Sequence, residues 1–175
     1  MNTFIILLKG INVGGHKKVP MAELRELLTN SGFVNVRTYI QSGNVILESL
    51  ENLKTAENSI HKVILTHFGF EVSVLAKTRE DIQRIFDDSP FTDDKKKSSY
   101  FMMLHDIPRY DLVKEASKKE YEGEEYYIIN DCIYFYSAKG YGQAKFNANF
   151  FERKLQTFAT SRNYNTMLKL LSLSE

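Results

Sequence analysis

The sequence predicts an α+β protein built from two tandem ferredoxin-like halves of the β-α-β-β-α-β type, with an additional C-terminal helix. Three observations predict this fold class. Short β-rich runs alternate with helical stripes, this order occurs twice along the 175 residues, and a polar, turn-rich stretch separates the two passages. We therefore expect a first subdomain over residues 1–88, including a linking helix, and a second over residues 89–175 with the C-terminal helix.

The first half opens with a strand and a helix. The run Phe4–Leu8 is continuously apolar and is stopped by Gly10, which predicts a central strand. After a glycine-rich loop, Pro20 begins a helix, where its missing N–H costs no hydrogen bond. The apolar stripe of this helix consists of Met21, Leu24 and Leu28.

A hairpin, a second helix and a strand complete the first half. Two β-rich runs, 34–40 and 44–48, flank Gln41-Ser42-Gly43, and this spacing predicts a hairpin in which Gly43 adopts a positive φ. A strand is expected over 71–76, after Phe68-Gly69-Phe70 ends the helix. The stripe that predicts the helix is Leu53, Ala56, Ile60, Val63 and Ile64.

The second half repeats the order. Thr78 is the expected N-cap of the linking helix, and residues 87–97 form the expected boundary between the halves. Strands are predicted over 100–104, 125–129 and 132–136, and helices after Pro108 and over 146–155. In place of a last strand, we expect the polar segment 160–166 to lead directly into a Leu-rich helix over 167–173.

Composition limits the classes of function. The 23 basic and 22 acidic side chains nearly cancel, so a nucleic-acid-binding protein of this composition would have to concentrate its positive charge locally. A lone cysteine, Cys132, fits a reducing compartment. No apolar run approaches the roughly 20 residues that span a bilayer, and the N-terminal run reads as a buried strand rather than a signal peptide. We expect a cytoplasmic protein.

The loop between the first strand and the first helix is the first candidate ligand site. Consecutive glycines bring backbone N–H groups close to an anion, and the nearby helix N-terminus and lysines add positive charge. The spacing does not match the phosphate loop of nucleoside triphosphatases, because His16 occupies the position of its Lys. The alternative is a glycine-shaped turn with solvated lysines. The candidate residues here are Lys9, Asn12, Gly14, Gly15, Lys17 and Lys18.

Two further polar segments are candidates. The hairpin residues Gln41, Ser42 and Asn44 offer amides and a hydroxyl to a ligand, or else they cap their own turn. The segment around Arg162, Asn163 and Asn165 precedes the final helix, with Asn165 or Thr166 as the expected cap. It either contacts a ligand or pins the helix to the sheets.

Several of these segments resemble the signatures of one bacterial family, catalogued as domain of unknown function 1697. The matching segments are Lys9–Gly15, Val19–Met21, Arg37–Val45 and, as a second signature, Ala159–Thr166. The chain departs from the family in having Lys9 where Arg is usual and Tyr164 where Trp is usual. The resemblance implies tandem ferredoxin-like subdomains and no particular activity.

Other patterns are weak. The four histidines and one cysteine lack metal-ligand spacing, so no metal site or cofactor is expected, and no catalytic constellation is identifiable. Residues 139–146 only partly resemble the octapeptide of RNA-recognition motifs. Tyr134 and Tyr136 either stack bases on an open sheet face, or this face packs against another subdomain or a second protomer.

The leading hypothesis is a module that binds a phosphate-bearing ligand, either a nucleotide or a nucleic acid, in a cleft between the halves. The alternative is a protein-interaction module, such as a homodimer, whose open sheet faces hold the partner.

Overall fold

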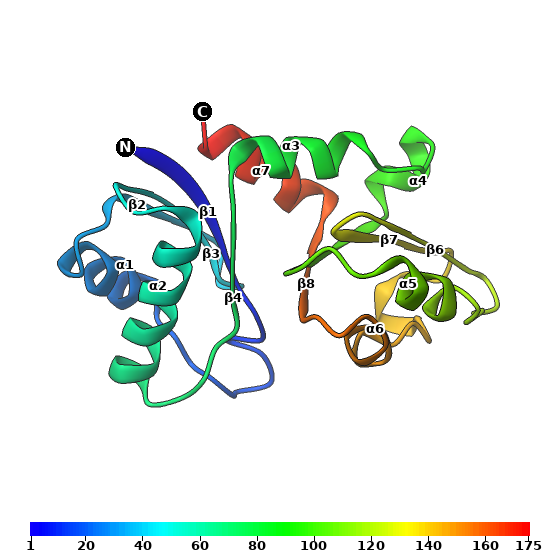
Figure 1. Cartoon of the computed structure of the whole chain (residues 1–175), viewed down its shortest axis with the longest axis horizontal. Helices are drawn as coiled ribbons and strands as arrows, with labels where there is room; N and C mark the ends of the chain where they lie inside the picture. Colours follow the sequence, from blue (N-terminus) through cyan, green and yellow to red (C-terminus); the bar gives the residue numbers. More distant parts are fainter. The chain divides into compact units, whose positions relative to one another are not determined.

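In the computed structural model, which covers residues 1–175, the chain forms two compact units (Figure 1). The first comprises Met1–Gln83 with Lys169–Glu175, and the second comprises Arg84–Leu168. The elements of the first unit are β1 (Asn2–Leu8), α1 (Met21–Asn30), β2 (Val34–Tyr39), β3 (Asn44–Ser49), α2 (Leu53–Phe68) and β4 (Val74–Lys77).

The second unit repeats the same order of strands and helices. Its elements are α4 (Asp93–Lys97), β5 (Tyr100–Leu104), α5 (Tyr110–Ala116), β6 (Glu124–Ile129), β7 (Cys132–Ser137), the 3₁₀ turn η1 (Tyr141–Gln143), α6 (Ala148–Leu155) and β8 (Ala159–Asn163). Two helices, α3 (Arg79–Asp87) and α7 (Tyr164–Leu173), contribute residues to both units.

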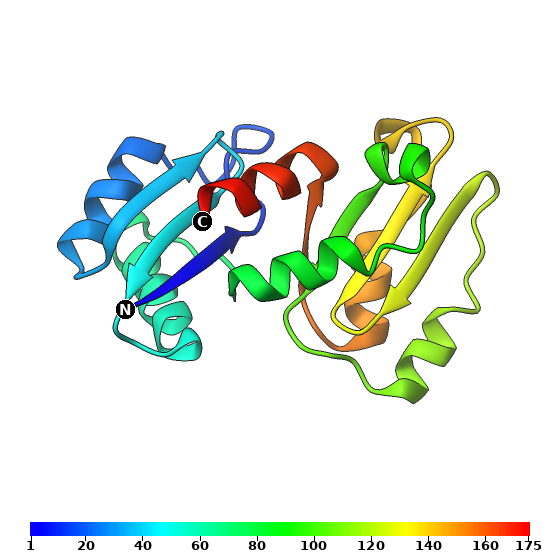
Figure 2. The ribbon, with the colours of Figure 1, turned by 90° about the horizontal axis from the view of Figure 1, so that it is seen from above.

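Each unit contains one four-stranded sheet, in which all neighbouring strands are antiparallel. The strand orders are β2-β3-β1-β4 and β6-β7-β5-β8, so the two sheets are built in the same way. The predicted α+β class and the two similar halves are confirmed. Figure 2 shows the two sheets from above, with the first in blue to green and the second in green to orange.

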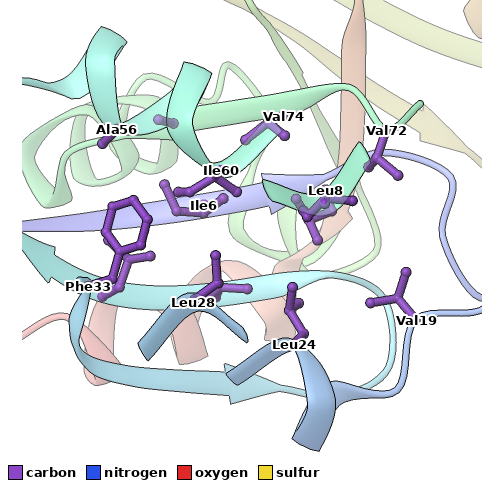
Figure 3. Packing of buried hydrophobic residues seen from close by; sticks show 14 of the residues in the cluster. Ile6, Leu8, Val19, Leu24, Leu28, Phe33, Ala56, Ile60, Val72 and Val74 are labelled. Atoms are coloured by element: carbon purple, nitrogen blue, oxygen red, sulfur yellow. The ribbon is translucent and has the colours of Figure 1, made fainter. Parts of the chain in front are cut away.

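The core of the first unit lies between one face of its sheet and the helices α1 and α2 (Figure 3). Leu24 and Leu28 on α1 and Ile60 on α2 point toward Ile6 and Leu8 on β1. Asn52 begins α2 by accepting a hydrogen bond from the Thr55 N–H at 2.9 Å. Gly69 ends α2 with φ of 77°, a left-handed conformation that suits glycine.

The opposite face of the first sheet is buried as well. Ile5, Leu7 and Ile46 are 0% exposed and Leu75 is 1% exposed, although these side chains alternate with the core residues and therefore point to the other side. Proteins that stack nucleotide bases on a sheet need an exposed face with aromatic side chains. The first sheet has no such face.

The second sheet is covered on one face and partly covered on the other, where Tyr127 at the edge is 46% exposed. On one side, Phe151 packs in a cluster with strand and helix residues. On the other side, Tyr134 is 1% exposed and its hydroxyl donates a 2.7 Å hydrogen bond to the Ile85 carbonyl. Phe86 stacks on Phe101 with ring centroids 5.7 Å apart. Tyr134 is therefore packed within the second unit and is not available to stack bases.

One sequence prediction is wrong: the polar segment after residue 159 is a strand. Ala159–Asn163 forms β8 and pairs antiparallel with β5, with Tyr100 opposite Asn163. Thr160 and Arg162 are 6% and 7% exposed, so the buried face of this strand carries polar side chains, and an analysis based on hydrophobicity misses it. The cap is also corrected, because the Asn163 Oδ1, not Asn165 or Thr166, accepts the Thr166 N–H at 2.9 Å.

The burial of Tyr126 predicts a loss of stability at alkaline pH. Its hydroxyl donates to the Ala116 carbonyl at 3.0 Å, and burial raises its pKa to about 12. Because the folded pKa lies above the ordinary value of 10.0, the neutral form stabilises the fold below pH 10, and this contribution is lost as the pH rises through about 12. We expect the urea midpoint to fall over this range less steeply in Tyr126→Phe than in the wild type. The control is Tyr110→Phe, since Tyr110 is 82% exposed; equal slopes in all three proteins would contradict the prediction.

Candidate functional site

The loop after β1 forms a small protruding hairpin, which we call the glycine tongue (residues 12–18). The Asn12 N–H donates to the Lys17 carbonyl at 3.1 Å and the His16 N–H donates to the Val13 carbonyl at 3.0 Å. Between these pairs, Gly14 and Gly15 have φ values of 58° and 77°. Two consecutive positive φ angles are the requirement of a tight hairpin turn of the primed type, which explains the two glycines.

The Asn12 side chain fixes the base of the tongue. Its Nδ2 donates to the carbonyls of Val19 at 3.0 Å and Gln41 at 2.8 Å, while its Oδ1 accepts the Val19 N–H at 2.8 Å. Ile11 and Val19, which flank the tongue, are each 1% exposed. The tongue is therefore anchored to its own two ends and to the β2–β3 hairpin.

The β2–β3 hairpin is held by its own polar groups. Asn44 is 0% exposed, and its Nδ2 donates to the Tyr39 carbonyl at 3.1 Å and to the Ser42 Oγ at 3.0 Å. The Gly43 carbonyl accepts the Leu8 N–H at 2.8 Å. These contacts support the turn-capping interpretation for Ser42 and Asn44. The backbone carbonyl of Gln41 accepts the hydrogen bond from the Asn12 side chain, and Gln41 itself is exposed.

The exposed end of the tongue is basic. All residues from Val13 to Lys18 are exposed, so they are not packed into either core. The Lys17 Nζ donates to the Glu71 carbonyl at 2.6 Å, while the Glu71 carboxylate contacts His61. Lys9 is half-buried at the start of the loop, where its N–H donates to the Ser73 carbonyl at 3.0 Å. An incoming anion would meet the glycine backbone together with the charges of Lys17 and Lys18.

Arg162 lies in the second unit and is a buried strand residue. Its Nη1 donates to the Thr160 Oγ1 at 2.7 Å and to the Ser161 carbonyl at 2.8 Å. Burial lowers the pKa of the guanidinium to about 10, from an ordinary value of 12.5. With 7% of its surface exposed, Arg162 supports the structural interpretation of this segment.

Asn163 and Asn165 line a hollow of about 120 Å³ at the N-terminus of α7, together with Lys97, Ser98 and Tyr164. Helix N-termini favour anions because their N–H groups and dipole point outward. Lys97 and Ser98 are exposed. Lys97 falls in the stretch 87–97 that the sequence predicts to be a boundary, whereas Asp93–Lys97 is the helix α4, and Ser98 follows it.

The structure thus brings part of the predicted set together. The tongue and the β2–β3 hairpin meet within the first unit through Asn12. Together they contain Asn12, Gly14, Gly15, Lys17, Lys18, Gln41, Ser42 and Asn44, and Lys9 precedes the tongue in the same unit. The other three residues, Arg162, Asn163 and Asn165, belong to the second unit. Of the first group, Asn12, Ser42 and Asn44 support the loops, and Gly14, Gly15, Lys17, Lys18 and Gln41 are exposed.

The structure contains neither a metal-ligand cluster nor a membrane-spanning helix. The structure has no group of three or more His, Cys, Asp or Glu side chains arranged to hold a metal ion. None of its helices combines the length and the apolar composition that a membrane span requires.

Comparison with known proteins gives a fold neighbour. The structure of the conserved bacterial protein SP0830 from Streptococcus pneumoniae is 26% identical in sequence and superposes with a TM-score of 0.80, over 99% of this chain and 98% of that chain. No curated protein matches the chain. The similarity to the SP0830 structure covers both units.

The family resemblance read from the sequence is confirmed for most of the chain. The matching family model covers residues 1–134, which include the tongue, the β2–β3 hairpin, β5, β6 and the first residues of β7. The second signature at residues 159–166 lies outside the matched region. The chain belongs to the family described as protein of unknown function DUF1697.

Proposed function

We propose that this protein binds a phosphate-bearing ligand, a nucleotide or a nucleic acid, through the glycine tongue. One observation carries the proposal: the base of the tongue is fixed by the three hydrogen bonds of Asn12, while its basic end is exposed. A loop that is held in place yet packs into neither core has a shape maintained for a purpose other than stability.

The chemistry of the tongue suits phosphate. Gly14 and Gly15 carry no side chain that would shield their backbone, so a phosphate oxygen can approach their N–H groups. Lys17 and Lys18 supply positive charge on a protein whose net charge is only +1. Asn12, Ser42 and Asn44 act by positioning the loop, since their own polar groups are hydrogen-bonded within the protein.

The covered sheets determine how a nucleic acid would be recognised. The strand order β2-β3-β1-β4 and its repeat support the ferredoxin-like assignment. The first sheet offers no open aromatic face, and on the strands of the second sheet Tyr127, 46% exposed, is the one exposed aromatic side chain. Binding would therefore go through the phosphate backbone and would have little sequence specificity. The hollow beside Lys97, Asn163 and Asn165 is a second anion contact in this proposal. The single buried cysteine, Cys132, supports a cytoplasmic location.

The double substitution Lys17→Ala with Lys18→Ala tests the proposal. Fluorescence anisotropy with a labelled short RNA and a labelled short DNA duplex measures the affinity at several salt concentrations. If both lysines contact phosphates, the double variant binds about 10-fold more weakly, and the slope of log K against log salt becomes shallower by about 1.4 for RNA and about 1.8 for duplex DNA.

The matched control is Lys118→Ala with Lys119→Ala, a second exposed lysine pair that lies in the second unit. It should leave the salt slope within error of the wild type. Equal losses in the two double variants would show that binding follows net charge and would reject the tongue as the site. Nucleotide binding is tested in parallel by measuring the melting temperature of the protein with ATP or with inorganic pyrophosphate, which should rise if either one binds.

A further inference from the structure

A hollow of about 870 Å³ lies wholly within the first unit. Its wall includes apolar side chains from the C-terminal half of α1, from the residue before β2 and the first residue of β2, from the residue after β3 and from α2, namely Leu27, Phe33, Val34, Leu50 and Val63. Leu50 is 83% exposed and Val34 is 41% exposed, so part of this apolar wall faces solvent. The volume is in the range of pockets that hold small organic molecules, roughly 300–1,000 Å³.

Glu51 lines the same hollow, and one of its carboxylate oxygens receives no hydrogen bond from any donor group of the protein. Its backbone N–H donates to the Ser49 Oγ at 3.0 Å, and its Oε1 has only a long contact of 3.5 Å with the Ser59 Oγ. Its Oε2 is shielded from solvent and accepts no hydrogen bond from the protein. Buried carboxylate oxygens are normally paired, because desolvating them without a partner is costly.

The other ionisable groups at the hollow are Lys62, His67 and the Met1 amino group, and none of them forms an ion pair with Glu51. The His67 Nε2 is paired with the Glu23 Oε1 at 2.7 Å. Lys62 is exposed at the rim and makes no ion pair. The terminal torsion of a glutamate side chain is soft, so the carboxylate can turn toward a cation that enters the hollow.

We propose that this hollow binds a small amphipathic amine, with its ammonium group paired to Glu51 and its apolar body against the wall defined above. The apolar wall and the carboxylate that lacks a donor are separate observations, and together they specify the two parts of the ligand. The site does not involve the glycine tongue and does not depend on the phosphate-binding proposal.

Three probes with the same apolar body and different head groups test this assignment: 4-phenylbutylamine, 4-phenylbutan-1-ol and 4-phenylbutanoate. Each is titrated into the full chain and followed by amide NMR shifts. We expect the amine to bind about 10-fold more tightly than the alcohol, since a hydrogen bond to a charged group is stronger than a neutral one. In Glu51→Gln, the amine and the alcohol should bind within about 2-fold of each other.

Two variants on one helix show where the probes bind, and both replace an exposed, uncharged residue of α2. Thr66 lines the hollow, so Thr66→Trp should block the amine. Asn58 is not among the residues that line it, so Asn58→Trp should leave the affinity unchanged. The proposal is overturned if the amine does not bind, if it binds no better than the alcohol, or if Thr66→Trp leaves its binding intact. Tighter binding of the anion, lost in Lys62→Met, would overturn it in favour of a Lys62 site.

Discussion

Replacing Gly43 by alanine is expected to lower the free energy of unfolding by about 3 kcal/mol. A Cβ built at this position would lie 2.7 Å from the Leu8 Cβ and 3.0 Å from the Leu8 carbonyl oxygen. The φ of Gly43 is 83°, which adds the backbone strain of an L-residue in the left-handed region. Because the Leu8 N–H bonds to the Gly43 carbonyl, the clash cannot be relieved without separating β1 from the β2–β3 hairpin.

The control for this substitution is Gly69→Ala at the end of α2. Gly69 has a similar φ of 77°, but a Cβ there would meet nothing within 4 Å. It therefore isolates the backbone strain, which is about 1 kcal/mol. Chemical unfolding followed by circular dichroism measures both variants. Equal losses of unfolding free energy in Gly43→Ala and Gly69→Ala would show that the close contact with Leu8 does not contribute to the destabilisation.

The substitution Asn12→Asp is expected to cost about 2–3 kcal/mol of stability, although it keeps the shape of the side chain. The Nδ2 of Asn12 donates to two carbonyl oxygens, those of Val19 and Gln41. A carboxylate oxygen in its place has no proton to donate and faces both oxygens. The variant should also weaken phosphate binding, since the tongue loses its anchor and gains a negative charge.

Asn130→Asp provides the comparison for this prediction. Asn130 has a φ of 51°, close to the 54° of Asn12, and it is exposed at the turn between β6 and β7. The same chemical change there should cost less than about 0.5 kcal/mol. If the two variants were equally stable, the hydrogen bonds of Asn12 would not anchor the tongue.

The elements with a clear apolar period could be predicted from the sequence. The stripe of Leu24 and Leu28 on α1 and the continuous run of β1 point to one core, and the structure buries them together. In both cases a local pattern reports directly on burial. The hairpin at Gly43 is also a local signal, because a two-strand turn needs a residue that tolerates positive φ.

Strand β8 could not be predicted in this way, because its buried residues Thr160 and Arg162 are polar. Their burial depends on the fold around β8, which pairs with β5, a partner far earlier in the chain. The burial of Tyr134 is a tertiary property too, and it excludes the base-stacking role that this residue otherwise suggests.

The candidate site likewise combines features that the sequence predicts with features that only the structure reveals. An asparagine in a loop is equally suited to a ligand and to its neighbours, and only the coordinates show that Asn12 and Asn44 bond within the protein. Glu51 has no sequence signal, because the hollow beside it is lined by residues from separate elements. Residue type therefore identifies polar loops, while the contacts decide which polar groups remain available.

The most direct test of phosphate binding follows the backbone amides of Gly14, Gly15 and His16 by NMR during titration with a short RNA. A ligand held at the tongue shifts these three signals first, and added salt reverses the shifts. Unchanged tongue signals, alongside clear shifts elsewhere on the protein, would contradict the assignment of this loop as the phosphate site.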